Sequence, residues 1–443
     1  MHHINNIMAY PVKDLYIRYG HKKLFFNVPE RFNILDVADF EDIPVLSDIK
    51  NLTINALDNP VDALPLEKQL RPFDRIAILI EDNTRNSPKK EILKYLLEKL
   101  DAISIPESNI IIIVALGTHE ALTRKEMILT YGEEVVNNYT IINHDSLSPD
   151  LVPVGKLKSG TIVKINRMAH EADFRIGIGS IFPHPLNGFG GGGKIMFPGI
   201  SNFDAILEHH MRYAFRKVVL GEFSNNPFYD EVISLASAGR LDFIINSVLD
   251  HNDNLYQVVA GNPISAHKKG ADICKKLVSK TFKKKADITI ISAFPYTQAT
   301  QLMKPLEPAS IITREQGVII LVGRCTSAFN KGYLDACLEF REKYKGRLKE
   351  ALFDFFNSGQ RIISGGAPEL NMSIAQVILA LESYHIILFS EEVPKEDAEK
   401  LGFIYAATIE DAIHSGSELI QSPGVIIVPS GGVIIPELEQ IQV

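Results

Sequence analysis

Residues 174–198 read FRIGIGSIFPHPLNGFGGGGKIMFP, and they join a short apolar run directly to a dense glycine cluster. Phe174–Gly179 has the composition of a buried strand, whereas the residues after it carry His184 and Lys194 among the glycines. Glycine in such density gives up side-chain packing and conformational entropy, so it usually lets backbone approach a ligand or presents N–H groups to an anion. The stretch therefore predicts a binding loop after a strand, with Lys194 directed at a phosphate, a carboxylate or a covalent partner.

One known motif fits part of this loop. Gly188–Lys194 matches the start of a phosphate-binding P-loop, but Ile195 stands where the motif requires Ser or Thr. Pro198 also lies where a P-loop continues into the first turns of a helix. A nucleotide-binding phosphotransferase or ATPase that uses Gly188–Lys194 is therefore the alternative function, and the preferred function needs another role for the lysine.

Strands and helices alternate on both sides of the loop. Ile76–Ile80, Ile110–Leu116 and Ile244–Leu249 are short apolar runs that favour buried strands. Between the first two runs, Lys89–Leu100 places its apolar residues on one helical stripe. Such alternation is typical of parallel sheets with helices on their faces, so the sequence predicts the α/β class with mainly parallel sheets.

A chain of 443 residues is too long for one ordinary core, so at least two domains are expected. A lysine-rich amphipathic helix is expected over Ala266–Phe282, and a new series of strands and helices begins after it. We therefore predict a first, catalytic domain over residues 1–284, to which residues 415–443 return. A second α/β domain is predicted over residues 285–414.

The composition excludes several classes of protein. A net charge of −8 and a pI near 5.9 argue against a nucleic-acid-binding surface. The three cysteines, Cys274, Cys325 and Cys337, lack metal-type spacing, and so small a number favours a reducing cytosol. The sequence has no signal-peptide pattern and no apolar run long enough to span a bilayer. We expect a cytoplasmic protein without nucleic-acid or membrane partners, and a homo-oligomer remains open.

Polar residues follow the predicted strands at the points where open α/β sheets bind ligands. Asp82 and Arg85 follow the first apolar run, and His119 follows the second. Histidine suits acid/base work and metal binding, and an arginine fork matches a carboxylate. Asp82 is interpreted equally well as the cap of a turn or helix. His251 and His267, outside these positions, are expected at the surface.

In their order and separations, these residues resemble the lactate racemase family of nickel-pincer-nucleotide enzymes. The resemblance covers the first predicted domain and reaches into the second. The matching motifs are Asp82-x-x-Arg85, Gly117-Thr118-His119, Pro183-His184, the glycine run to Lys194 with Pro198-Gly199, His210, and Gln301-x-x-Lys304. Each motif is weak alone, but the combined set is specific.

The resemblance implies a cofactor, the pyridinium-3-thioamide-5-thiocarboxylic acid mononucleotide with nickel. It implies that Lys194 is joined to this nucleotide and that His210 is a nickel ligand, with His209 as the rival. The cofactor would supply the soft sulfur donors that a cysteine-poor chain lacks. The further cofactor-binding residues that it implies are Asp82, Gly191, Gly192 and Gly193.

The resemblance also implies a reaction, the racemisation or epimerisation of a 2-hydroxy acid by reversible hydride transfer. His119 and His184 would act as acid and base on opposite sides of the substrate, in a cleft that the second domain closes. Arg85 and Lys304 would hold the substrate carboxylate, and Gln301 would add a hydrogen bond. The implied partners are a small-molecule 2-hydroxy acid and, transiently, the enzymes that make the cofactor.

The chain departs from the family pattern at Thr300. Lactate-type members commonly carry a large aromatic residue just before the glutamine, whereas this chain has threonine. Thr300 removes bulk and adds a hydroxyl group beside the substrate. This favours a 2-hydroxy acid that is larger or more polar than lactate, such as a sugar acid.

Overall fold

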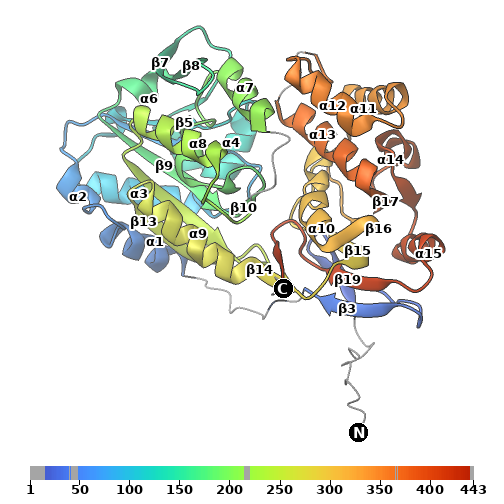
Figure 1. Ribbon diagram of the computed structural model, residues 1–443. Helices are drawn as coiled ribbons and strands as arrows, with labels where there is room; N and C mark the ends of the chain where they lie inside the picture. Colours follow the sequence, from blue (N-terminus) through green and yellow to red (C-terminus); the bar gives the residue numbers. More distant parts are fainter. Residues whose placement is uncertain are drawn as a thin grey trace. The chain divides into compact units, whose positions relative to one another are not determined.

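The structure is a computed structural model that describes residues 15–38, 40, 48–213, 220–364, 366 and 368–439. The chain divides into two compact units (Figure 1). We call Asp42–Val278 the central unit, and Met1–Glu41 together with Ser279–Val443 the terminal unit. Each unit contains one six-stranded sheet with mainly parallel strands, which confirms the predicted fold class.

The six-stranded sheet of the central unit is parallel except at one edge, where β13 runs antiparallel to β12. In spatial order its strands are β13 (Leu255–Gly261), β12 (Phe243–Leu249), β9 (Phe174–Ile181), β4 (Ile76–Ile80), β5 (Ile110–Val114) and β6 (Thr140–Asn143). The chain places β5 and β6 on one side of β4, and β9 and β12 on the other. The order of the strands therefore reverses between β4 and β9.

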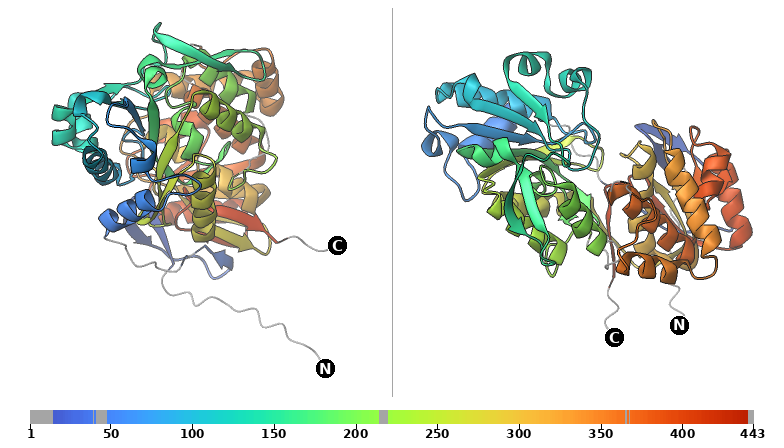
Figure 2. Two further views of the ribbon diagram at one scale, coloured as in Figure 1. Left: turned by 90° about the vertical axis from the view of Figure 1, so that its left-hand side faces the viewer. Right: turned by 90° about the horizontal axis from the view of Figure 1, so that it is seen from above.

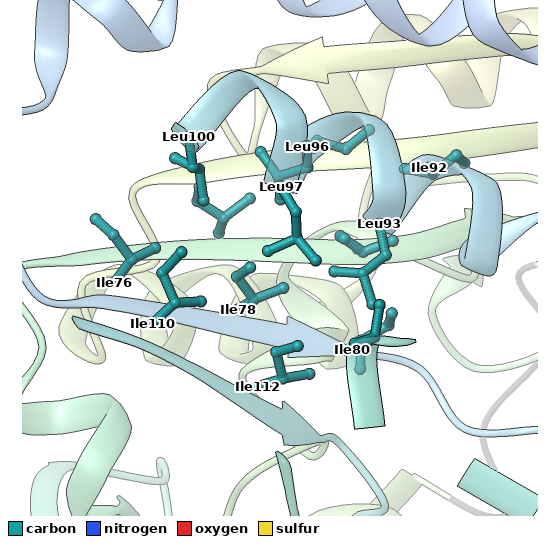
Figure 3. Packing of buried hydrophobic residues seen from close by; sticks show 14 of the residues in the cluster. Ile76, Ile78, Ile80, Ile92, Leu93, Leu96, Leu97, Leu100, Ile110 and Ile112 are labelled. Atoms are coloured by element: carbon teal, nitrogen blue, oxygen red, sulfur yellow. The ribbon is translucent and has the colours of Figure 1, made fainter. Parts of the chain in front are cut away.

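Strand β4 is buried on both faces of this sheet. Successive side chains of a strand point to opposite faces, so its three isoleucines belong to one apolar layer while Ala77 and Leu79 belong to the other. Figure 3 shows the isoleucines of β4 and β5 facing the leucines of α3 (Lys89–Ala102). Burial on both faces explains why these strands are continuous apolar runs in the sequence.

Helices cover both faces of the central sheet (Figure 2). Helices α1 (Ile49–Asp58) and α3 pack on one face, and α9 (Ser265–Val278) packs against β12 and β13 on the other. The remaining elements of this unit are α2 (Leu66–Gln69), η1 (Glu107–Asn109), α4 (Arg124–Tyr131), α5 (Glu133–Asn138), β7 (Leu151–Lys156), β8 (Ile162–Asn166), α6 (Arg167–Glu171), β10 (Pro183–His184), β11 (Gly188–Phe189), η2 (Gly192–Ile195), α7 (Phe203–Tyr213) and α8 (Pro227–Ala238).

The six-stranded sheet of the terminal unit is parallel throughout. In spatial order its strands are β18 (Ile404–Ala406), β17 (Tyr384–Phe389), β16 (Thr313–Val322), β15 (Ala286–Ser292), β19 (Gly424–Val428) and β3 (Asn33–Val37). Its other elements are β1 (Tyr16–Tyr19), β2 (Lys22–Phe25), β14 (Ser279–Phe282), η3 (Ala299–Met303), α10 (Leu306–Ile312), α11 (Lys331–Lys343), α12 (Leu348–Asn357), α13 (Pro368–Ser383), α14 (Lys395–Leu401), α15 (Ile409–Leu419) and β20 (Ile435–Leu438). The order of the strands reverses between β15 and β19.

The structure groups the two ends of the chain differently from the predicted domains. Strand β19 pairs with β15 on one side and with β3 on the other, so residues 415–443 and the N-terminal strands belong to the terminal unit. The sequence could not show this, because a parallel pairing joins strands far apart in the chain. The observed boundary at Ser279 lies close to the predicted boundary at residue 284.

The predicted helix over Ala266–Phe282 is four residues too long, because α9 ends at Val278 and Ser279–Phe282 forms β14. Strand β14 pairs in parallel with β20 near the other end of the chain. The pairing with β20 is a tertiary contact, and it overrides the helical periodicity of the lysine-rich segment.

Candidate active site

The candidate active site of the central unit lies at the carboxyl ends of β4, β5 and β9. Ile80 pairs with both Ile178 and Val114, so the segments that follow the three strands emerge at one edge of the sheet. Asp82 follows β4 and His119 follows β5, while His184 follows β9. Open α/β sheets bind ligands where the order of strands reverses, and here the reversal falls between β4 and β9.

Asp82 holds His119 by a hydrogen bond. The Asp82 Oδ2 atom lies 2.5 Å from Nδ1 of His119, and Oδ1 accepts hydrogen bonds from the backbone N–H and the hydroxyl of Thr84. Burial alone would raise the pKa of Asp82, but the hydrogen bond with His119 and the charge of Arg85 hold that pKa well below its usual value. The ionised carboxylate therefore accepts the Nδ1 proton, which leaves the Nε2 lone pair of His119 to accept another proton.

His184 is held in the opposite tautomer by backbone groups. Its Nδ1 atom accepts N–H hydrogen bonds from Leu186 at 3.2 Å and Asn187 at 3.1 Å. A neutral imidazole that accepts at Nδ1 carries its proton on Nε2. The Nε2 atom lies 2.9 Å from Nζ of Lys194, so the histidine is the donor in that contact.

In this tautomer of His184, the amine of Lys194 accepts the hydrogen bond through its lone pair. Desolvation, followed by repulsion from the nearby Arg85, lowers the pKa of Lys194 to about 7. Its Nζ atom also lies 5.6 Å from the centre of the Phe228 ring. A lysine whose pKa lies near neutral pH can form a covalent bond through its lone pair, so the covalent role stays a prediction that this pKa permits.

Arg85 reaches across from the end of β4 to the end of β9. Its guanidinium carbon lies 4.7 Å from the centre of the Phe182 ring, and Nη1 donates to the carbonyl and hydroxyl oxygens of Thr84, each at 3.0 Å. Stacking on an aromatic face fixes the plane of the guanidinium. The fork is therefore oriented in advance for a planar anion such as a carboxylate.

His210 and His209 on α7 have different surroundings. His210 donates from Nδ1 to the carbonyl of Ile206 at 2.9 Å, which leaves the Nε2 lone pair as its coordinating atom. His209 is fully buried, with Phe197 and Phe228 rings centred 4.9 Å and 4.2 Å away, and burial lowers its pKa to about 3. His210 therefore has the chemistry of a metal ligand, and His209 has that of a core residue.

The glycines of the loop are required by neighbouring protein groups. A Cβ atom at Gly191 would lie 2.9 Å from Oδ1 of Asn246, and one at Gly192 would lie 2.4 Å from Nδ1 of His267. At Gly193 it would lie 2.9 Å from Cβ of Ala236. These contacts account for the glycines by packing, so their predicted role in binding the cofactor stays a prediction.

The loop does not have the geometry of a P-loop. The residues around Lys194 form the short 3₁₀ helix η2, and the next α-helix, α7, begins only at Phe203. A P-loop lysine stands in the first turn of a helix whose N-terminus faces the phosphates. The structure thus removes the main support for the alternative phosphotransferase or ATPase.

Gln301 and Lys304 lie at the carboxyl end of β15 in the terminal unit, on and just after η3. Nζ of Lys304 lies 3.4 Å from Oε1 of Gln301 and 4.2 Å from the centre of the Tyr296 ring. The carbonyl of Thr300 accepts a hydrogen bond from Ser373 at 3.4 Å, so its backbone is tied to α13. The structure brings these residues of the predicted substrate site together within their own unit.

Two residues near the loop are absent from the predicted site. Asn246 and His267 are both buried and both contact the glycine turn, and the expectation that His251 and His267 lie at the surface is wrong. His267 stands on the apolar stripe of α9, and Asn246 interrupts an apolar strand. A polar residue at a position that the periodicity assigns to the core was the signal that could have identified both.

The donor groups determine what could hold a metal or cofactor. Within the ranges that the structure describes, no three His, Cys, Asp or Glu side chains are grouped so that they could hold a metal ion by themselves. The site nevertheless offers one imidazole lone pair, on His210, and one neutral amine, on Lys194. These two groups fit a cofactor that brings most of its own metal ligands and binds covalently to lysine.

A sheet edge that carries two histidines, an arginine stacked on an aromatic ring and a lysine of lowered pKa has the groups that acid–base chemistry uses. Residues 19–219 match the lactate racemase N-terminal domain. The lactate racemase of Thermoanaerobacterium thermosaccharolyticum is 31% identical over 319 residues, which are 70% of this chain and 74% of that protein. That of Lactiplantibacillus plantarum is 35% identical over 273 residues, 60% of this chain and 64% of that protein. The chain belongs to the lactate racemase family and is an isomerase of that family.

Solved structures agree with this assignment. The lactate racemase apoprotein from Thermoanaerobacterium thermosaccharolyticum matches with a TM-score of 0.82 at 25% identity, over 96% of this chain and 100% of that one. A structural-genomics protein from Thermotoga maritima matches with a TM-score of 0.65 at 17% identity, over 90% of this chain and 100% of that one. The second match concerns the fold alone.

The lowered pKa of Lys194 predicts its reactivity in the protein without cofactor. Acylation of Lys194 by a small amine-reactive anhydride, which releases a carboxylate as the leaving group, should be half-maximal near pH 7, whereas an ordinary lysine is half deprotonated at about pH 10.4. Below pH 7 labelling should slow about tenfold for each pH unit, because the protonated amine does not react. Peptide mass spectrometry after brief labelling at each pH measures this, with the exposed Lys94 and Lys395 as internal comparisons. A midpoint for Lys194 near pH 10 would contradict the prediction.

Proposed function

We propose that this protein interconverts the two configurations at C2 of a 2-hydroxy acid, with a nickel-pincer nucleotide joined to Lys194. The observation that carries the proposal is the pair of histidines in opposite tautomers at one sheet edge, beside the neutral amine of Lys194. Two members of the same family are lactate racemases with 31% and 35% identity to this chain, which supports the reaction class.

The groups present fit the implied cofactor. Lys194 would hold the nucleotide through its Nζ atom, and His210 would bind nickel through Nε2, because its Nδ1 proton is directed to Ile206. The aromatic surroundings of His209 argue against that residue as the ligand. When bound, the cofactor would supply reversible acceptance of the C2 hydride, together with the sulfur ligands of nickel. Asp82 would contribute indirectly, through His119.

The two histidines would handle the hydroxyl proton. His119 has an Nε2 lone pair and would take the proton as C2 is oxidised. His184 would return a proton to the oxygen on the opposite side of the substrate from Nε2, acting as an imidazolium so that a neutral imidazole is left. One ring would therefore be neutral and the other protonated at the start of each turnover, and the two rings would exchange these states when the substrate has the other configuration.

Two cationic groups and one amide would bind the substrate carboxylate. Arg85 is oriented by the Phe182 ring and is the candidate on the central unit. Lys304 and Gln301 are the candidates on the terminal unit, where they contact each other. The predicted cleft between the two domains stays a prediction. The proposed partners are the 2-hydroxy acid and, transiently, the enzymes that make the cofactor.

A cytoplasmic location is part of the proposal. All three cysteines are buried and free, which agrees with a reducing compartment. None of the helices in the described ranges is long and apolar enough to cross a membrane. The oligomeric state stays open.

The first test is cofactor loading. The full chain, produced together with the cofactor-making enzymes, should gain the mass of the cofactor on the peptide that contains Lys194 and should carry about one nickel ion per chain. Lys194→Ala should abolish the added mass. Lys194→Arg is the matched control that keeps a long basic side chain without a neutral amine, and it should also remain unmodified. An unmodified wild-type chain would contradict the proposal if a known family member is loaded under the same conditions.

Asp82→Asn tests the acid–base assignment. The substitution keeps the shape of the side chain but removes the carboxylate that accepts the Nδ1 proton of His119. We expect kcat of the loaded enzyme to fall about 10²-fold or more in both directions, with nickel content unchanged. Asp173→Asn, which removes an exposed carboxylate paired with Arg75, is the control and should leave kcat unchanged. A normal kcat in Asp82→Asn would contradict the role of the pair.

Thr300 predicts the class of substrate. Its small side chain, in place of the large aromatic residue that the sequence analysis noted, should admit a larger or more polar 2-hydroxy acid than lactate. Comparison of kcat/KM for lactate and for a panel of aldonates should favour an aldonate, and Thr300→Tyr should shift the preference back towards lactate. If lactate is clearly the better substrate of the wild-type enzyme, the hypothesis is wrong.

A further inference from the structure

Two buried polar side chains contact the glycine turn that leads to Lys194. His267 on α9 is fully buried, and its Nε2 atom lies 2.7 Å from the carbonyl oxygen of Gly190. Asn246 on β12 has an exposed fraction of 2%, and its Oδ1 atom accepts the N–H of Gly192 at 2.9 Å. One turn is therefore held at two successive peptide groups, by one donor and one acceptor.

His267 can only donate in this contact. A carbonyl oxygen accepts hydrogen bonds, so the proton of the imidazole must lie on Nε2. The Nδ1 atom is buried without a hydrogen-bond partner, and burial lowers the pKa of His267 to about 4, so the ring is neutral. A buried lone pair without a partner is costly, which indicates that the contact with Gly190 is what retains histidine here.

The close approach of α9 is also built into the sequence. A Cβ atom at Gly270 would lie 2.3 Å from Ile181 and 3.0 Å from Val259, so only glycine allows the helix to lie this near the sheet. Gly270 is one turn after His267 on the buried face of α9. The helix thus brings the imidazole of His267 close to the end of β9 and into contact with the glycine turn.

The turn itself needs external support. Gly191 has φ 76° and ψ −157°, and Gly192 has φ 56°, conformations that side-chain-bearing residues rarely adopt. Glycine has many other conformations available, so a turn of consecutive glycines does not fix its own shape. The two bonds to Asn246 and His267 restrict it, and the backbone N–H of Lys194 bonds to Gly191 at 3.2 Å.

We propose that Asn246 and His267 are positioning residues that hold Gly190–Gly192 in the conformation that delivers the amine of Lys194 to His184. Neither residue needs to touch substrate or cofactor for this role. That these two hydrogen bonds hold the turn, which we call the hold on the turn, does not depend on the proposed function. Their effect on cofactor attachment does rest on it. The turn is an element that sets the position of the lysine before any cofactor arrives.

The hold on the turn is tested by hydrogen exchange in the full chain without cofactor. His267→Phe keeps an aromatic ring next to Phe223 and Tyr229 but removes the N–H group that donates to Gly190. Amide exchange in the peptide that spans Gly190–Lys194 should become about tenfold faster, the factor expected from the loss of one buried hydrogen bond. Asn246→Leu, which removes the acceptor, should have a similar effect.

Conservative and matched variants separate positioning from stability. In His267→Gln the amide Nε2 can take the place of the imidazole donor, so slow exchange should be restored. Cys274→Ala trims the same buried face of α9 farther from the turn and should leave exchange near Lys194 unchanged. Unchanged exchange in both His267→Phe and Asn246→Leu, or no rescue by glutamine, would overturn the proposed hold.

Cofactor loading provides the second measurement. Mass spectrometry should show the Lys194 peptide of His267→Phe and Asn246→Leu gaining the cofactor at least about tenfold more slowly than in wild type, with His267→Gln near wild type. Normal loading of the two disruptive variants would overturn the positioning role even if exchange is faster. Failure of the wild-type chain to load would instead refute the proposed function, and hydrogen exchange would still decide the hold on the turn.

Discussion

The carboxylate of Glu81 joins the ends of β4 and β9, and the geometry of the candidate site depends on this join. Its Oε2 atom accepts hydrogen bonds from the backbone N–H and the hydroxyl of Ser180, each at 2.9 Å. The ammonium of Lys89 lies 3.9 Å from Oε1 of Glu81, and Tyr131 donates to the backbone carbonyl of Glu81 at 3.0 Å. A carboxylate with so little exposure to solvent needs such partners. Because Asp82 is the next residue, the network fixes the position from which Asp82 reaches His119.

The two histidines reach opposite tautomers through different kinds of partner. His119 is set by the charge of Asp82, and His184 is set by two backbone amides of its own loop. A carboxylate and a pair of N–H groups impose opposite demands on Nδ1, so neither tautomer depends on bound substrate. The lone pair on Nε2 of His119 and the proton on Nε2 of His184 are therefore set by the protein itself. The amine of Lys194 lies within hydrogen-bond distance of that Nε2 atom of His184.

The sequence was a good guide wherever burial on both faces of a sheet left a continuous apolar run. The predicted strand Ile76–Ile80 has the bounds of β4, and Asp82 and Arg85 follow it at the sheet edge as expected. Prediction failed where long-range pairing decides the structure. Strand β19 joins the sheet of the terminal unit through β15 and β3, and β14 forms by pairing with β20. Neither pairing leaves a pattern in local composition.

The glycine cluster shows that prediction from local sequence is also limited at the level of single atoms. Its composition predicts space for a ligand, because missing side chains let the backbone approach one. In the structure, a Cβ atom at Gly188 would lie 2.2 Å from the carbonyl oxygen of Glu222, and one at Gly190 would lie 2.5 Å from the ring of Phe182. Both explanations require glycine, so composition alone cannot separate them.

The packing explanation has a consequence for function. Neighbours that fill the space of every absent Cβ also limit how far the loop can move. A loop of flexible residues thereby becomes rigid. The amine of Lys194 is then held in one position next to His184. A high density of glycine is thus compatible with a rigid site, because rigidity here comes from the surrounding β9, β12, α8 and α9 and not from the loop itself.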